Sequence, residues 1–485
     1  AERGDEALYR GLTHLQAEEF IHEQPAFPEP EYAFKHVLTQ EVVYQSLLAD
    51  RRGVMHERAA RAIEELHRHS LDAHYVELAL HYSQTTETAK AVDYLRMAGE
   101  QAARRSTYDE AINRLGQAAD LAATLAETRE RHQQEVLVQL ALGQALVVTK
   151  GFGTSEAERA FSRARNLCER LEQPRELLRA IEGLWLIHQA RAEHDKEEEH
   201  AKALLRLARG MSDPELLSVG HLVMGLTCYF QGEFFRAREH LEEVIAQGGP
   251  QEFGADKLRH SWLDPRVVAF AYLSWVLWSL GFPDAATRRS RGALALARSR
   301  SHPFSEAFSL VFALPIHRLR GDCQAALDGA EAALRLSEAQ GFPQWVGIGA
   351  FEQAAALADR GRLEEGIAGM HSFLDGLRAT GRGLNLPLVL TLLAEAHGNA
   401  GQAEEGLTLL AEAQERVNRT GERVYEVEML RLKGELLLAL PTPRQSDAEA
   451  ALLAALETGR EQHAKSWELR AATSLARLWQ QQDRR

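Results

Sequence analysis

Four histidines in one short stretch, His67, His69, His74 and His81, have side chains that could bind a metal ion. A zinc site requires three or four ligands that converge on the ion at about 2 Å. His67 and His69 stand two positions apart, and residues with this spacing on a helix point to different sides. We therefore interpret these histidines as solvated residues near a turn between helices, and we predict no metal site.

The acidic run EHDKEEEHAK, residues 193–202, could attract a cation. Carboxylates are also favoured in the first turn of a helix, where they complement the positive end of the helix dipole. The run is therefore predicted to be a water-facing first turn, with a cation site as the minor alternative.

No residues can be nominated as catalytic. The sequence has no G-x-x-x-x-G-K-[S/T] phosphate-binding loop. Serines, histidines and carboxylates occur by chance throughout a long helical array, so their presence does not predict a triad or an acid and base pair. We therefore expect that this chain is not an enzyme by itself, and we predict no cofactor for it.

Composition narrows the location and the partners. The 485 residues carry a formal charge of -14, which disfavours binding to nucleic acid or to anionic lipid. The cysteines Cys168, Cys228 and Cys323 are far apart and odd in number, which is typical of a reducing cytoplasm. No apolar run approaches the roughly 20 residues needed to cross a bilayer. The sequence thus predicts a cytoplasmic protein that avoids membranes and nucleic acid, and its start at Ala1 without methionine indicates a fragment or a processed product.

A regular series of glycines reveals the architecture that must position any functional residues. One set recurs every 40 residues, and a second set with the same interval runs through its gaps. Such a recurrence predicts stacked helical pairs, which bury their neighbours' faces and leave a curved surface for a partner. The two sets are Gly281, Gly321, Gly361 and Gly401, and then Gly341, Gly381 and Gly421.

The pattern of small and large residues resembles that of the tetratricopeptide repeat. In residues 224–244, Gly225 would allow two helices to approach, and Ala237 and Leu241 would pack between them. We predict an all-α protein in which residues 71–485 form a right-handed superhelix, or α-solenoid, of about nine to ten pairs. A long loop is expected at about 248–265. In the later pairs, the small position of the second helix falls on Ala286, Ala326, Gly366 and Gly406.

Residues 1–70 differ from the rest. Apolar residues recur at helical spacing near the start, two short extended runs separated by prolines follow at about 20–36, and a helical pattern then resumes. Helix, β-hairpin and helix are typical of the end of a winged-helix module, so we predict a small winged-helix segment before the superhelix.

The stretch YAFKHVLTQEVVYQSLLADRRGVMHERAARAIEEL and the following LALHYSQTTETAKAVDYLRMAGEQAARRSTYDEAINRLGQAADL resemble a known bacterial arrangement. This is the C-terminal winged-helix and tetratricopeptide region of STAND-type ATPase regulators. The most similar ones are fused to class III adenylate or guanylate cyclases, and LuxR-type activators are next. The resemblance implies an upstream ATPase domain that uses ATP or ADP, and it gives His36 of the FKH motif a role as an ADP sensor in the parent protein. His36 could instead simply cap or pack the hairpin.

The inner face of the superhelix is the predicted site of recognition. Counting from the turn glycines places Tyr229, Phe230, Trp275, Trp278 and Arg318 there, as an aromatic groove with a basic edge. Tryptophan, tyrosine and arginine are the commonest binding hot spots. The expected partner is a protein, a peptide or a small effector, and a homo-oligomer is left open. The alternative is that the tryptophans fill the space between paired helices.

Three functions follow from these observations. The favoured one is a noncatalytic sensor and scaffold that regulates an upstream STAND ATPase and a nucleotide cyclase output. The second is part of a cyclase enzyme whose catalytic domain lies outside this fragment. The third is a transcription regulator of the LuxR-ATPase type.

Overall fold

The computed structural model shows an α-helical protein with one small β-hairpin, and the helices divide into two compact units, Ala1–Ala145 and Leu146–Arg485. Among the described residues, no helix combines the length and the apolar character needed to span a membrane. The structure describes residues 5–24, 31–105, 107–151, 153–211, 213–247, 264–380 and 382–482.

The hairpin lies where the sequence predicted it. The strands β1 (Ile21–Gln24) and β2 (Glu31–Phe34) pair antiparallel, with Ile21 opposite Phe34. The proline-containing segment between them, residues 25–30, lies outside the described residues. The hairpin follows α1 (Asp5–Ala17) and precedes α2 (Val37–Ser46) and α3 (Ala49–Leu66).

The first unit continues beyond residue 70 without a break in its core. Ala60 of α3 packs with Leu78 and Tyr82, and Glu64 accepts hydrogen bonds from Lys90 and Tyr94 at 3.0 and 2.7 Å. The predicted boundary at 70 and 71 stays a prediction, and the compact units divide within α7. The further elements of this part are η1 (Leu71–Ala73), α4 (Tyr75–Tyr82), α5 (Thr88–Arg104), α6 (Tyr108–Thr124) and α7 (Arg129–Lys150).

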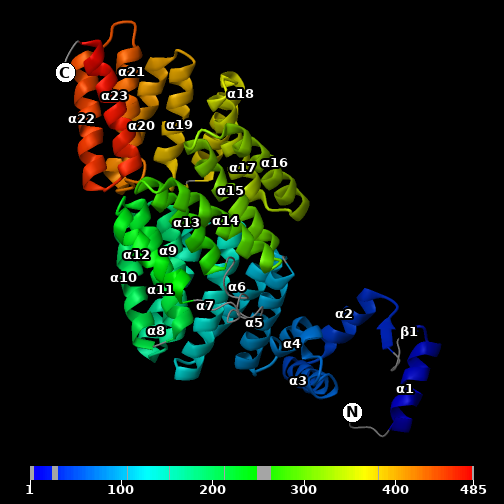
Figure 1. Cartoon of the computed structure of the whole chain (residues 1–485). Helices are drawn as coiled ribbons and strands as arrows, with labels where there is room; N and C mark the ends of the chain where they lie inside the picture. Colours follow the sequence, from blue (N-terminus) through cyan, green and yellow to red (C-terminus); the bar gives the residue numbers. More distant parts are fainter. Residues whose placement is uncertain are drawn as a thin grey trace. The chain divides into compact units, whose positions relative to one another are not determined.

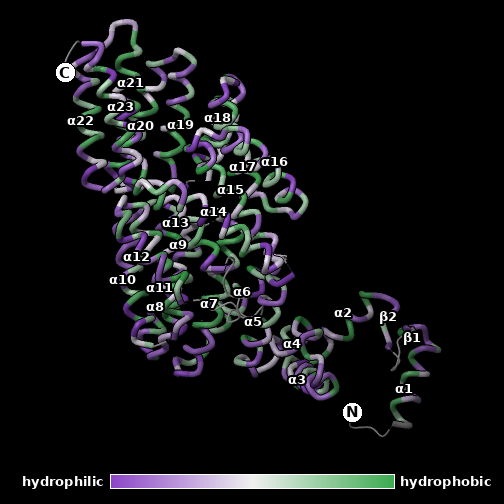
Figure 2. The backbone as a smooth tube through the Cα atoms, viewed as in Figure 1, coloured by the Kyte–Doolittle hydropathy of each residue, from purple (hydrophilic) through white to green (hydrophobic). Residues whose placement is uncertain are grey.

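The second unit is a tetratricopeptide-like α-solenoid, as the sequence predicted. Short turns join consecutive antiparallel helices, and Figure 2 shows hydrophobic and hydrophilic positions alternating along them. The predicted loop near 248–265 falls almost entirely on residues 248–263, which lie outside the described residues. The helices, drawn in Figure 1, are α8 (Ser155–Leu171), α9 (Pro174–Ala190), α10 (His194–Met211), α11 (Pro214–Phe230), α12 (Phe234–Ala246), α13 (Pro265–Ser279), α14 (Pro283–Ser299), α15 (Pro303–Leu319), α16 (Cys323–Gln340), α17 (Pro343–Asp359), α18 (Leu363–Thr380), α19 (Leu386–Asn399), α20 (Ala403–Thr420), α21 (Glu426–Ala439), α22 (Gln445–Glu461) and α23 (Lys465–Gln481).

The glycine series occupies turn positions that require a left-handed backbone. The first set has φ between 78° and 91°, and Gly341 and Gly421 of the second set have φ of 69° and 77°. L-residues adopt this region only at a cost, whereas glycine enters it freely. Gly381, the remaining member, lies outside the described residues.

Small residues on the second helix of each pair allow close contact, as expected. A Cβ on Gly366 would lie 2.7 Å from the carbonyl oxygen of Ala354, and one on Gly406 would lie 2.9 Å from that of Ala394. Ala286 and Ala326 are buried at the equivalent positions. Helix spacing in these pairs is therefore set by the absence of a larger side chain.

In the second unit, turns between earlier helices contact linkers between later helices that are far away in the sequence, and we call this contact the seam. The turns at 190–192, 230–232 and 278–281 contact the linkers at 383–385, 422–425 and 462–467. The backbone N–H of Gly383 donates to the carbonyl of Ala190 at 3.0 Å, and that of Arg423 donates to the carbonyl of Phe230 at 2.8 Å. In Figure 1 the lower ends of α20, α22 and α23 stand above α12 and α13.

Candidate partner-binding site

Four of the five predicted groove residues line one small cavity in the second unit. Tyr229 of α11, Trp275 and Trp278 of α13 and Arg318 of α15 surround a space of about 30 Å³. A space of this size holds one or two water molecules. Phe230 lies next to Tyr229 but points elsewhere in the core and does not line the cavity.

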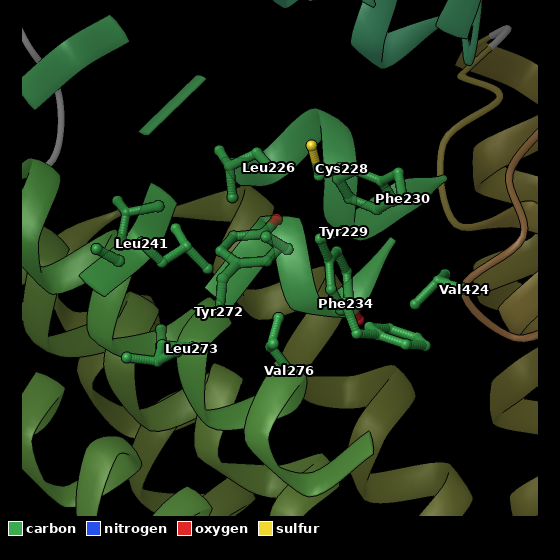
Figure 3. Close-up of a cluster of buried hydrophobic side chains, with 14 of the residues drawn as sticks. Leu226, Cys228, Tyr229, Phe230, Phe234, Leu241, Tyr272, Leu273, Val276 and Val424 are labelled. Atoms are coloured by element: carbon green, nitrogen blue, oxygen red, sulfur yellow. The ribbon is translucent and has the colours of Figure 1, made fainter. Parts of the chain in front are cut away.

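The aromatic residues are largely buried against one another. Tyr229 and Trp278 are 4% and 6% exposed, and Phe230 is fully buried, whereas Trp275 is half-buried. The ring of Tyr229 lies 5.9 Å from that of Trp275, which stacks on Phe312 at 4.7 Å and donates its indole N–H to the Phe312 carbonyl. Figure 3 shows Val424 of the later linker pointing toward this cluster. The inner face is therefore filled by the chain itself in this conformation.

Arg318 forms the polar wall of the cavity, and carboxylates neutralise it. Its Nε donates to Asp359 Oδ2 at 2.8 Å, and its Nη1 lies 3.5 Å from Glu352 Oε2. Burial lowers the pKa of Arg318, but Glu352 and Asp359 outweigh that effect and the pKa is raised. Burial raises the pKa of Glu352 despite the nearby arginine. The predicted basic edge is thus an internal ion pair.

The sequence analysis missed most of the other lining residues, among them Glu352, Tyr425 and Trp467. Trp467 meets Trp278 edge to face at 4.5 Å, and Tyr425 lies 5.3 Å from Trp467. Tyr425 and Trp467 come from pairs much later in the chain, and only the closure of the seam brings them here. In the sequence, only the large size of these two side chains and their position next to a turn could have indicated that they line the cavity.

The acidic run at 193–202 contains the start of α10, as predicted, but only part of it faces water, which corrects the prediction: Asp195, Lys196 and Glu199 are exposed, whereas other residues of the run are buried. His194 is 2% exposed and Glu197 is fully buried, and their side chains bond at 2.5 Å. Thr227 donates to Glu197 at 2.9 Å. The physical reason is the seam, because Glu422 of the later linker lies buried beside this pair and accepts from the backbone N–H of Asn385.

The buried carboxyl of Glu422 has an unusual pKa. The pKa is raised to about 7, chiefly by burial and to a smaller extent by the charge of Glu197, against the opposing effects of His194 and the Asn385 N–H. Burial lowers the pKa of His194, but the hydrogen bond and charge of Glu197 outweigh this, so the pKa is raised.

The histidines His67, His74 and His81 lie in separate contacts. The rings of His67 and His74 stack at 3.9 Å, whereas His81 bonds to His56 at 2.8 Å. In the part of the chain that the structure describes, no group of three or more His, Cys, Asp or Glu residues is arranged to hold a metal. His36 is exposed at the N-terminus of α2, where its side chain makes no capping hydrogen bond.

No protein-family model matches the chain. An uncharacterized protein of Rhizobium meliloti (strain 1021) is 25% identical over 451 residues, which is 92% of this chain and 43% of the relative. The chain therefore spans less than half the length of the curated relative that it matches.

Solved structures with related folds are distant. The apo form of the quorum sensor NprR from B. thuringiensis has a TM-score of 0.49 and 14% identity, with 76% of this chain and 93% of that chain covered. A Rap protein complexed with competence and sporulation factor has a TM-score of 0.48 and 13% identity, with 81% and 98% covered. A STAND protein with a tetratricopeptide repeat sensor from Pyrococcus horikoshii has a TM-score of 0.37 and 12% identity, with 76% and 62% covered. The fold assignment rests on the helical pairs described above.

Proposed function

We propose that this chain is the noncatalytic sensor and scaffold part of a larger bacterial regulator. In this proposal the solenoid binds a protein, a peptide or a small effector. The hairpin-containing segment transmits that event to an upstream STAND ATPase and a nucleotide cyclase output.

The observation that carries the proposal is the exposed apolar surface of α2. This helix has no buried residue, and Val37, Leu38 and Val42 are 78%, 74% and 68% exposed. Leu48, directly after it, is 79% exposed. Leu38 and Val42 stand four positions apart and therefore lie on one face of the helix. Apolar side chains gathered on an exposed face are typical of a site that another protein surface covers. The greater length of the relative supplies sequence for such a covering domain.

Recognition by the solenoid is supported by the residue types around the cavity. Tyrosine and tryptophan carry much of the binding energy in protein interfaces because they bury a large area at little entropic cost. Trp275 and Tyr425 are half-buried, whereas Tyr229, Trp278 and Trp467 are buried, so a partner can reach Trp275 with less rearrangement than the buried members require.

The upstream domain is tested by sequencing the coding region that precedes Ala1 and expressing the longer polypeptide. The proposal expects a phosphate-binding loop there, and it expects the amides of α2 to exchange more slowly than in the present chain. Val42→Lys should raise nucleotide turnover or release in that protein, whereas Gln45→Lys, on the same helix, should not. A preceding region without the loop, or an α2 equally exposed in both proteins, would exclude this arrangement.

The role of His36 as an ADP sensor in the parent protein belongs to the same proposal. Its exposed side chain is free of a capping bond and is available to a nucleotide held by a covering domain. His36→Ala should speed the release of ADP from the longer polypeptide, with unchanged release as the contrary result.

Partner binding is tested by selecting peptides on the full chain from a random library. Peptides that bind should lose at least tenfold in affinity to the Trp275→Ala variant. Phe235→Ala removes an aromatic side chain that is 49% exposed and does not line the cavity, so it serves as the control. Equal effects of the two substitutions would remove the cavity from the recognition site.

A further inference from the structure

We propose that residues 146–485 exchange between a closed and an open form. In the closed form, backbone hydrogen bonds at two positions, which we call the latch, join the two sides of the seam, and in the open form the seam separates while the helical pairs stay folded. The inference goes beyond the proposed function, because it requires neither a partner nor an upstream domain.

The latch consists of backbone hydrogen bonds at two equivalent positions, and at the first of them the N–H of Leu384 also donates to the carbonyl of Ala190, at 3.3 Å. The acceptors, Ala190 and Phe230, are the last residues of α9 and α11, and carbonyls at the end of a helix have no partner within it. The donors, Gly383 and Arg423, lie in linkers and have no helical acceptor of their own. Acceptors and donors are each 40 positions apart, so the repeat brings both bonds into register at once.

A buried apolar side chain follows each donor residue and anchors the linker by packing in the core. Leu384 and Val424, the residues after Gly383 and Arg423, are 5% and 4% exposed. Figure 3 shows Val424 directed at the aromatic cluster of α11 and α12. The two linkers therefore repeat one docking motif, a backbone N–H followed by a buried aliphatic residue.

A third contact with different chemistry continues the seam. Ser466 Oγ donates to the carbonyl of Trp278 at 2.5 Å across the seam. The bond from the Gln462 side chain to the carbonyl of Arg423, at 3.1 Å, joins two linkers on the same side of the seam. The seam thus consists of linkers and helix ends, and its separation breaks no hydrogen bond inside a helix. Apolar side chains on both sides of the seam belong to one buried core, but no helix has to unfold for the seam to separate. We therefore expect the seam to open at a lower free energy than global unfolding requires.

Closure of the seam also carries an electrostatic cost. It buries the carboxyl groups of Glu422 and Glu197 around one imidazole, that of His194. Buried charge that is incompletely paired opposes the closed form. Because Tyr425 and Trp467 stand on one side of the seam and Tyr229 and Trp278 on the other, opening exposes the aromatic cavity.

The test uses hydrogen exchange resolved to the linker 382–385 of the full chain. Arg423→Pro removes the donor of one bond, and Arg423→Ala, the matched control, keeps it. If the latch acts as a unit, Arg423→Pro speeds exchange of the distant Gly383 amide at least tenfold, whereas Arg423→Ala changes it less than twofold. The amide of Val389, which bonds within α19 to Asn385, reports that the helices remain intact. An unchanged Gly383 rate in a folded Arg423→Pro protein, or exchange at Gly383 only by global unfolding, would overturn the proposal.

A reversible lock provides a second test if the proline variant does not fold. A Cβ on Gly232 would lie 3.4 Å from that of Arg423, close to the spacing of a disulfide. It would also lie 2.7 Å from Gln462 Nε2, the end of a flexible side chain that has to shift, and a cysteine adopts the φ of 78° at this position only at a cost. The Gly232→Cys, Arg423→Cys protein should exchange Gly383 at least tenfold more slowly when oxidised than when reduced. Equal rates in the two states would show that the seam does not open as proposed.

Discussion

Gly225 of α11 faces Leu241 of α12 so closely that a Cβ added to Gly225 would lie 2.9 Å from Leu241 Cγ. The same relationship joins Gly99 to Leu115 and Gly434 to Leu452, each with 2.6 Å to the leucine Cγ. A leucine on one helix thus occupies the space left by a missing side chain on its neighbour.

Gly225→Ala is therefore expected to destabilise the second unit by about 1 to 3 kcal/mol, because the added methyl group overpacks a filled contact. The control is Gly210→Ala near the end of α10, where a Cβ would meet nothing within 4 Å. That change should be neutral or stabilise by up to about 1 kcal/mol. Urea unfolding of both variants measures the difference, and a Gly225→Ala protein as stable as the control would show that the contact is not close.

The local part of the fold could be predicted from the sequence because each helical pair is specified by its own residues. The repeated glycines, such as Gly281 and Gly421, indicate turns because they adopt a left-handed backbone. Ala286 and Gly366 indicate close contacts between helices because their side chains are small or absent. The seam could not be predicted in this way. Which turns and linkers meet there depends on the sum of small rotations between many successive pairs, and no single residue indicates that sum.

In the candidate site, too, the local contacts could be predicted from the sequence and the contacts across the seam could not. Tyr229, Trp275 and Trp278 were found because they face inward within neighbouring pairs, whereas Trp467 reaches them only through the seam. The burial of Glu197 was missed for a related reason, since its local sequence is typical of a solvated helix start and its cover comes from a distant linker.

A buried ion pair in α21 provides a second prediction. Glu428, 4% exposed, accepts from Arg431 at 2.8 and 2.9 Å and from Arg470 at 2.6 Å. Glu428→Gln removes the carboxylate that Arg431 and Arg470 share and leaves Arg431 with Glu435, at 2.5 Å, as its remaining counter-charge. Breaking a buried pair typically costs about 3 to 5 kcal/mol, and we expect the lower end of this range because Glu435 remains. In the exposed pair of Arg335 and Glu331, where the side chains are 70% and 59% exposed, Arg335→Met should change stability by less than about 1 kcal/mol. Chemical denaturation of both variants tests this, and similar small effects would contradict it.

The lowered pKa values of two histidines predict how the stability of the protein depends on pH. Burial, followed by the neighbouring His188 and His221, lowers the pKa values of His200 and His240 to about 4. Unfolded histidine titrates near 6.5, so between these values the unfolded chain binds protons that the native chain does not. Stability should therefore fall as the pH drops from 6.5 toward 4, by at most about 1.4 kcal/mol per pH unit for each histidine. His240→Gln should make the decline between pH 7 and 5 shallower, and an equally steep decline would argue that His240 is not responsible.

Glu422 contributes to the pH dependence with the opposite sign. Its native pKa of about 7 exceeds the value near 4.5 of an exposed carboxyl, so the native state retains a proton that the unfolded state releases. Its contribution to stability is present below pH 4.5 and is lost as the pH rises through 7, where the buried group becomes charged. Glu422→Gln keeps an oxygen that can accept from the Asn385 N–H and removes the charge. The variant should equal the native protein in stability at pH 5 and exceed it by about 1 to 3 kcal/mol at pH 8. Glu404→Gln, at an exposed position of α20, should show no such pH-dependent gain. If Glu422→Gln is instead less stable at pH 8, the ionised carboxylate is held by His194 strongly enough that its charge strengthens the seam.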